Sequence, residues 1–363
     1  MLKIQDLSKE NRRRVVLNKI NVEIPSGEFF CFLGPSGSGK TALMRMIAGL
    51  EKPDSGRILL NGEDITKLPA YKRDINTVFS SFALFPHYTV RENIEFGLNY
   101  KNISTSEKDR LVNETIEFFE LAPCLPKNIN ELNKLSKYKI ALARALINNP
   151  QILLLDDSLK LLDRKDRLRM RFELKNLQRK LSSTFIYITD DLSNAFSLGD
   201  RIALMQHGTV HQCSSPRAIY ENPETYFVAN YVGDMNFFYA NIVGKSEGHY
   251  LVELDNKLKI NLTALREYDP ERELFYAIRP ERITISAVPS NDPLQNSFEG
   301  KIVQKTYAGE YRYYFVELKS GKLVVAAELN YDFLSSGVPI TFFEVGEDVY
   351  INWSIMSGDL IYA

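Results

Sequence analysis

The feature that most constrains this chain is a glycine-rich stretch at residues 34 to 41, Gly-Pro-Ser-Gly-Ser-Gly-Lys-Thr, which follows the apolar run Phe29 to Leu33. It satisfies the spacing G-x-x-x-x-G-K-[ST]. Glycines let successive backbone N–H groups face one anion, and the N-terminus of a following helix adds a partial positive charge. Apolar residues recur at helical spacing between Leu43 and Leu50. The sequence therefore predicts a strand, a phosphate loop (residues 34–41) and a helix.

The phosphate loop predicts binding of ATP or a close relative together with Mg²⁺. In such loops the lysine reaches the β- and γ-phosphates and the hydroxyl residue ligates Mg²⁺. A second apolar run, Ile152 to Leu155, ends in Asp156, which is the expected magnesium-side acid; its other reading is a cap for a helix from residue 158 onward. The residues expected to bind nucleotide or metal are Gly34, Pro35, Ser36, Gly37, Ser38, Gly39, Lys40 and Thr41, with Thr41 and Asp156 on Mg²⁺.

The order of apolar patterns predicts an α/β core followed by an all-β region. Short buried runs alternate with helical patterns in the first two thirds, as in a parallel sheet flanked by helices. Thr184 to Thr189 reads as another strand, and residues 201 to 210 read as a hairpin. We expect a nucleotide-binding domain at residues 1–235, with a helical subdomain at about 88–148, and a barrel-like β domain at residues 236–363.

The composition excludes several classes of protein. The 45 Lys and Arg residues balance 46 Asp and Glu residues, so a nucleic-acid partner is not expected. The three cysteines lack disulfide-like or metal-ligand spacing, which favours a reducing compartment. The first residues show no signal-peptide pattern, and no apolar run approaches the roughly 20 residues needed to cross a bilayer. Any role at a membrane would therefore require a partner.

Stretches outside the phosphate loop resemble the ATP-binding subunit of an ABC importer. Those in the first part are Ile47–Thr66, Ala83–His87 and Ala141–Leu146. The β-rich part resembles the regulatory TOBE-type domain of polyamine and related importers. The stretches most similar to the spermidine/putrescine importers are Val232–Phe238, Ile278–Glu281 and Ile351–Trp353.

The resemblance implies an assembly at the cytoplasmic face of the inner membrane, where the chain would be peripheral. Its partners would be membrane permease subunits, a solute-binding protein through the complex, and a second ATP-binding subunit. Two such subunits close head to tail, and each ATP lies between one phosphate loop and the LSGGQ signature of the other subunit. The region from Phe82 to Tyr88 and the helical subdomain would contact the permease. The implied solute is a polyamine, although importers of iron, sugars or anions share this architecture.

The sequence departs from the family pattern at the signature. A gapless alignment puts Leu132-Asn133-Lys134-Leu135-Ser136 at LSGGQ, so the glycines are absent. An alternative alignment keeps Leu135-Ser136 as the family's Leu-Ser but deletes three residues at the start of the helix; we prefer the gapless one. Residues with a Cβ hinder a backbone that presents N–H groups to a γ-phosphate.

Other positions that the family uses in catalysis are also substituted. Asp157 stands in place of the glutamate that acts as general base, and its shorter side chain reaches less far. Ser80 replaces the glutamine that senses the γ-phosphate. Asp190 replaces the switch histidine, and a carboxylate about 4 Å from a phosphate oxygen is unfavourable by roughly 4 kcal/mol at an effective dielectric constant of about 20.

Two further departures concern the base and a connecting loop. Asn11 takes the place of the aromatic residue that stacks on adenine, and Arg12, Arg13 or Arg14 could stack there instead. Lys160-Leu161-Leu162-Asp163 replaces the family's Ser-Ala-Leu-Asp loop. The pattern predicts a chain that binds ATP but hydrolyses it poorly by itself. It would be an importer motor, the degenerate half of a mixed dimer, or a regulatory nucleotide-binding subunit.

Overall fold

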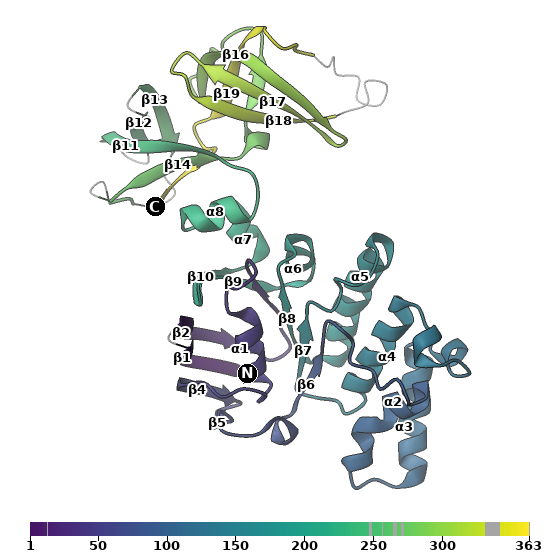
Figure 1. Ribbon diagram of the computed structural model, residues 1–363. Coiled ribbons are helices and arrows are strands. Elements are labelled where there is room, and N and C mark those ends of the chain that lie inside the picture. Colours follow the sequence, from purple (N-terminus) through teal and green to yellow (C-terminus); the bar gives the residue numbers. More distant parts are fainter. Residues whose placement is uncertain are drawn as a thin grey trace. The chain divides into compact units, whose positions relative to one another are not determined.

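The structure, a computed structural model (Figure 1), divides into two compact units, Met1–Ala218 and Ile219–Ala363. The residues that it describes are 1–12, 14–246, 249–255, 257–263, 267–269, 272–330 and 342–362. The division falls before the boundary expected at residues 235 and 236, because the last turns of helix before the β-rich region group with the second unit.

The first unit is built on a six-stranded sheet with the order β10-β9-β3-β8-β7-β6. Its strands are β3 (Phe29–Leu33), β6 (Ile75–Val78), β7 (Ile152–Asp156), β8 (Thr184–Thr189), β9 (Arg201–Gln206) and β10 (Thr209–Ser214). The strands from β9 to β6 are parallel, and β9 and β10 form the predicted antiparallel hairpin. All residues of β3 and β8 are buried, as expected for parallel strands covered on both faces.

A second sheet in this unit is antiparallel and has the order β2-β1-β4-β5. Its strands are β1 (Leu2–Asn11), β2 (Arg14–Ile24), β4 (Ser55–Leu60) and β5 (Glu63–Asp64). Its buried face shares one hydrophobic core with the helix after the phosphate loop and with the main sheet, as Ile4, Met44 and Ile186 illustrate. This shared core holds the phosphate loop between the two sheets.

Helices surround the main sheet. The α-helices of the first unit are α1 (Lys40–Ile47), α2 (Val90–Glu95), α3 (Thr105–Phe118), α4 (Lys134–Leu146), α5 (Arg164–Leu181) and α6 (Leu192–Leu198). Short 3₁₀ helices are η1 (Ala70–Lys72), η2 (Phe96–Tyr100), η3 (Ala122–Cys124) and η4 (Ile129–Glu131). The region expected as a helical subdomain contains α2, α3 and α4, which Figure 1 shows grouped at one end of this unit.

The second unit is all-β after two short helices, α7 (Pro216–Glu221), which straddles the division, and α8 (Tyr226–Tyr231). One five-stranded sheet contains β13 (Leu258–Thr263), β12 (His249–Leu254), β11 (Asn236–Ser246), β14 (Leu274–Ile278) and β20 (Asp359–Tyr362). The other contains β15 (Thr284–Ser286), β19 (Asp348–Ser354), β16 (Gln295–Ala308), β17 (Tyr311–Leu318) and β18 (Leu323–Leu329), with η5 (Pro280–Arg282) before it. Both sheets contribute to one core around Trp353. Across the described ranges, no helix is long and apolar enough to cross a bilayer.

Candidate nucleotide-binding site

The predicted site residues meet at one edge of the main sheet. Strands β3, β8, β7 and β6 are neighbours and run parallel, so their carboxyl ends lie along the same edge. The register pairs Leu33 with Thr189 and Asp156 with Ile188. The predicted site residues that follow these strands are Gly34, Ser80, Asp157 and Asp190. Ligands bind outside this edge in open parallel sheets.

The phosphate loop needs its glycines for close packing. A Cβ on Gly34 would collide with the carbonyl oxygen of Met205. Gly39, with φ of 100°, is the N-cap of α1, and a Cβ there would lie 2.6 Å from Leu17 Cδ2 and 2.7 Å from the carbonyl oxygen of Val16. Strand β2 therefore touches the loop and fixes its path. The open N-terminus of α1 adds a partial positive charge that favours phosphate.

The Lys40 ammonium group lies inside the curve of the loop. Its Nζ donates to the carbonyl oxygens of Gly34 at 2.7 Å and Pro35 at 2.9 Å, and to Ser38 Oγ at 3.1 Å. The side chain is buried, and this burial lowers the pKa of Lys40, whereas the negative charge of Asp190 opposes the shift. A phosphate group at this position would meet a partly desolvated cation, which strengthens their attraction.

The residues expected to bind Mg²⁺ fit a magnesium ion that is also held by phosphate oxygens. Asp156 ends β7 and is half-buried, and burial raises its pKa, with a further contribution from Asp157. A bound cation would favour the ionised form of this carboxyl group. Thr41 is exposed in the first turn of α1. The alternative role of Asp156, as the cap of a helix from residue 158 onward, is wrong, because α5 begins at Arg164 and is capped by Asp163.

Asp157, at the position of the general base, is held by the neighbouring strand. It has a φ of 41°, and its backbone N–H donates to the carbonyl oxygen of Ile188 at 2.8 Å. Its Oδ1 accepts a hydrogen bond of 2.8 Å from Thr189 Oγ1, and its Oδ2 lies 3.4 Å from Lys160 Nζ. Both carboxylate oxygens of Asp157 therefore already have partners within the chain.

Asp190, at the position of the switch histidine, lies beside the same lysine. Lys160 Nζ is 3.4 Å from Asp190 Oδ1 and 3.3 Å from Oδ2. The hydrogen bond with Asp190 and the charge of Asp157 raise the pKa of Lys160, so this lysine is protonated at neutral pH. Three of the substituted positions thus form one cluster, the Asp157–Lys160–Asp190 triad. Sequence reasoning noted each substitution but gave no role to Lys160, because nothing in the sequence links it to Asp190.

Asn11 lies at the exposed end of the β1–β2 hairpin, opposite Arg14. Of the arginines expected as alternatives for base stacking, Arg13 lies outside the described residues. The same hairpin carries Val15, which is 51% exposed and precedes Val16, the residue whose carbonyl faces the phosphate loop. Val15 is an exposed apolar residue next to the phosphate loop that the sequence analysis did not single out, and its signal was only an apolar residue after a run of charges.

A groove of about 890 Å³ lies between the end of β6 and the helical region. Its lining residues are Tyr71, Asn76, Thr77, Phe79, Ala83, Phe85, Phe96, Gly97, Tyr100, Arg144, Ala145 and Asn148. Arg144 donates to the carbonyl oxygens of Phe82 at 2.9 Å and Ala83 at 2.8 Å and stacks on Phe85. Exposed Ser80 precedes this segment by two residues.

The signature position forms a self-capped helix start. Helix α4 begins at Lys134, and Asn133 is its N-cap, with Oδ1 accepting from the backbone N–H of Ser136 at 2.8 Å. Leu135 and Ser136 lie within the first turn of α4, which supports the gapless alignment. One N–H that could face a phosphate is therefore already bonded within the chain.

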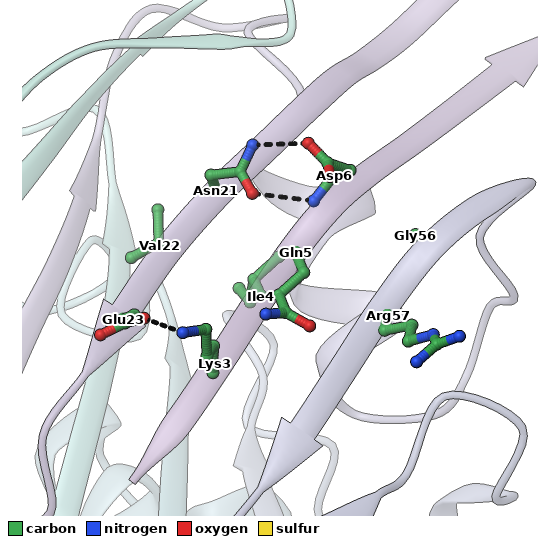
Figure 2. A pocket seen from close by; sticks show the side chains of 9 residues that line it. All are labelled: Lys3, Ile4, Gln5, Asp6, Asn21, Val22, Glu23, Gly56 and Arg57. Atoms are coloured by element: carbon green, nitrogen blue, oxygen red, sulfur yellow. Dashed lines mark hydrogen bonds and ion pairs between the residues drawn. The ribbon is translucent and has the colours of Figure 1, made fainter. Parts of the chain in front are cut away.

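A second concavity, of about 570 Å³, lies on the antiparallel sheet (Figure 2). Figure 2 shows Asn21 paired with Asp6 and Lys3 paired with Glu23 across β1 and β2. Its lining contains none of the phosphate-loop residues. The polar side chains of Lys3, Asp6, Asn21 and Glu23 in this lining are paired with one another, so we assign the concavity no ligand.

The chain matches known families along both units. The family described as ABC transporter matches residues 17–160, and the TOBE domain matches residues 276–358. Proteins named spermidine/putrescine import ATP-binding protein from Hahella chejuensis and Vibrio cholerae are 39% and 36% identical over 97% of this chain and 95% and 92% of their own lengths. A dimeric ATP-binding cassette bound to ADP and Pi has 29% identity and a TM-score of 0.53, covering 60% of this chain and 99% of the cassette.

Proposed function

Because this chain belongs to the family of ABC-transporter ATP-binding proteins with a TOBE domain, we propose that it drives import of a polyamine, spermidine or putrescine. The observation that carries the proposal is the similarity to proteins named for this import across 97% of the chain. The similarity includes the β-rich region as well as the ATP-binding cassette.

In this proposal, Lys40 and the backbone N–H groups of residues 34–41 hold the β- and γ-phosphates of ATP. Thr41 and Asp156 hold Mg²⁺, which would neutralise phosphate charge. The buried Lys40 ammonium and the open N-terminus of α1 support these roles. The hairpin that carries Asn11 and Val15 would border the base.

The partners proposed for the chain are a second ATP-binding subunit and membrane permease subunits at the cytoplasmic face of the inner membrane, with a solute-binding protein joining through the complex. The groove beside Phe85 supports permease contact, because it is lined by aromatic side chains and by Arg144, which bonds the backbone of Ala83 and lies over the Phe85 ring. Buried aromatic anchors commonly dominate the binding energy of such interfaces.

The chain alone would hydrolyse ATP slowly. A general base must lie within about 2.6 to 3.2 Å of the atom whose proton it takes, and both oxygens of Asp157 are engaged by Thr189 and Lys160. Asn133 bonds the N–H of Ser136 within its own helix. These contacts favour a subunit that binds ATP and depends on a second, intact ATPase for efficient turnover.

The import proposal is tested in cells that lack their own polyamine uptake. The permease and solute-binding protein that co-purify with the chain from its own cells are expressed with it, and uptake of labelled spermidine and putrescine is measured. We expect uptake that is lost in Lys40→Ala. Uptake of iron, a sugar or an anion instead of polyamine would refute the solute assignment and leave the ATP-binding role standing.

The hydrolysis proposal is tested by phosphate release from the purified chain. We expect slow release that rises when a catalytically intact ATPase subunit is added. Turnover by the chain alone at roughly 1 s⁻¹ or faster, within the usual range of enzymes, would refute it.

A further inference from the structure

Lys160 joins two of the substituted catalytic positions. Its Nζ lies 3.3 Å from Asp190 Oδ2 and 3.4 Å from Asp157 Oδ2. The next carboxylate along the chain, Asp191, is paired separately with Arg167 at 3.3 Å and caps α6. The contacts of Lys160 are therefore directed to the two aspartates at the edge of the sheet.

These aspartates lie at the same edge of the main sheet as the phosphate loop. Asp190 follows Thr189, which pairs with Leu33, the residue just before the loop. The backbone N–H of Asp157 donates to the carbonyl oxygen of Ile188 on the same strand, β8, at 2.8 Å. Lys40 is the residue that reaches the terminal phosphates in loops of this kind. A γ-phosphate beside Lys40 would therefore stand close to two carboxylates, and the unfavourable energy would grow as water is excluded.

We infer that Lys160 is a charge-compensating residue that offsets Asp190 and Asp157 and so allows this site to bind a nucleoside triphosphate. The inference rests on the proposed ATP-binding function. Lys40 and Lys160 supply two positive charges against the three negative charges of Asp156, Asp157 and Asp190. Without Lys160, one positive charge in contact with both Asp157 and Asp190 is lost from the phosphate site. Lys160, in the loop after β7, and Asp190, just after β8, therefore act as a pair of opposite charges.

The inference predicts an effect that depends on the third phosphate. The purified full chain is titrated with a non-hydrolysable ATP analogue and with ADP, each with Mg²⁺, by isothermal titration calorimetry. We expect Lys160→Met to weaken binding of the analogue by about tenfold, or 1.4 kcal/mol. The loss is limited because Lys160 is 61% exposed and its charge is screened by water. Binding of ADP should change less, since ADP lacks the phosphate nearest the carboxylates.

Three further variants separate compensation from general damage. Lys160→Arg should keep the ratio of analogue to ADP affinity, because it keeps the charge. The double variant Lys160→Met with Asp190→Asn should restore the ratio, because it removes the carboxylate that needs compensation. Lys165→Met removes an exposed lysine at the start of α5 and should leave the ratio unchanged. Thermal unfolding of each variant is measured alongside.

An unchanged ratio in Lys160→Met, or a double variant that stays as weak as the single one, would overturn the inference while the proposed ATP binding stands. If the wild-type chain bound neither nucleotide, and Lys40→Ala behaved like the wild type, both the proposed function and the inference would fall.

Discussion

Replacing Gly39 by alanine should destabilise the first unit more than the same change at Gly37. Both glycines have positive φ, 100° and 82°, and an alanine there is strained by about 1–2 kcal/mol. At Gly37 the added Cβ meets no atom within 4 Å, whereas at Gly39 it would lie 2.7 Å from the carbonyl oxygen of Val16. That oxygen belongs to the backbone of β2 and cannot rotate away. Overpacking of this kind costs about 1–3 kcal/mol, so Gly39→Ala should lower the free energy of unfolding by that much more than Gly37→Ala does.

The measurement is urea unfolding of both variants, followed by far-ultraviolet circular dichroism and by tryptophan fluorescence. The sequence has one tryptophan, Trp353, which is buried in the second unit, so fluorescence follows that unit and the dichroism signal follows both. We expect Gly39→Ala to lower the free energy of unfolding of the first unit and to leave the fluorescence transition in place. Equal losses in the two variants would refute the argument that β2 packs against the phosphate loop.

Three other substitutions test the surroundings of the site. Asn133→Ala removes the cap of α4 and should lower the free energy of unfolding by about 1 kcal/mol in urea titrations. Arg73→Met removes a buried guanidinium that donates to four backbone carbonyls, including those of Met46 and Ile47, and should destabilise the first unit by about 3 kcal/mol. Asp156→Asn should raise the thermal midpoint at neutral pH but abolish the gain in ATP affinity from Mg²⁺. The pKa of Asp156 is raised in the folded state, so this carboxyl group makes the wild type less stable as the pH rises above its ordinary pKa of 3.8. The variant lacks the carboxyl group and should not show this loss of stability.

The elements that fix the phosphate site were predictable because their sequence signals are local. Phe29–Leu33 and Thr184–Thr189 have the strand bounds that their apolar runs predict, since parallel strands buried on both faces are continuous in apolar residues. The glycine spacing of the phosphate loop and the helical spacing of apolar residues after it are also local signals. The all-β character of the C-terminal region followed from short alternating runs.

The contacts among the catalytic positions could not be predicted in the same way. Lys160 and Asp190 are 30 positions apart, and only the parallel pairing of β7 with β8 brings their loops together. Periodicity reports which face of an element is buried, but it carries no information on which two loops meet at a sheet edge. The cap formed by Asn133 had a local signal, an asparagine before a helical pattern, that the comparison with the signature obscured.

In the function that we propose, ATP binding and ATP hydrolysis depend on different parts of this structure, so that binding would persist where hydrolysis declines. The phosphate cradle depends on backbone geometry: Gly34 and Gly39 are packed against Met205 and β2, and a change there disturbs the core. The positions expected to act in catalysis, Ser80, Asp157 and Asp190, lie beyond the ends of strands, where side chains are at least partly exposed and substitution leaves the sheet intact. A site in which the phosphate loop and the catalytic positions lie on separate elements can lose its general base and still bind ATP, provided that its charges stay balanced. On that argument the pairing of Lys160 with Asp190 belongs with the phosphate loop, among the features that preserve binding.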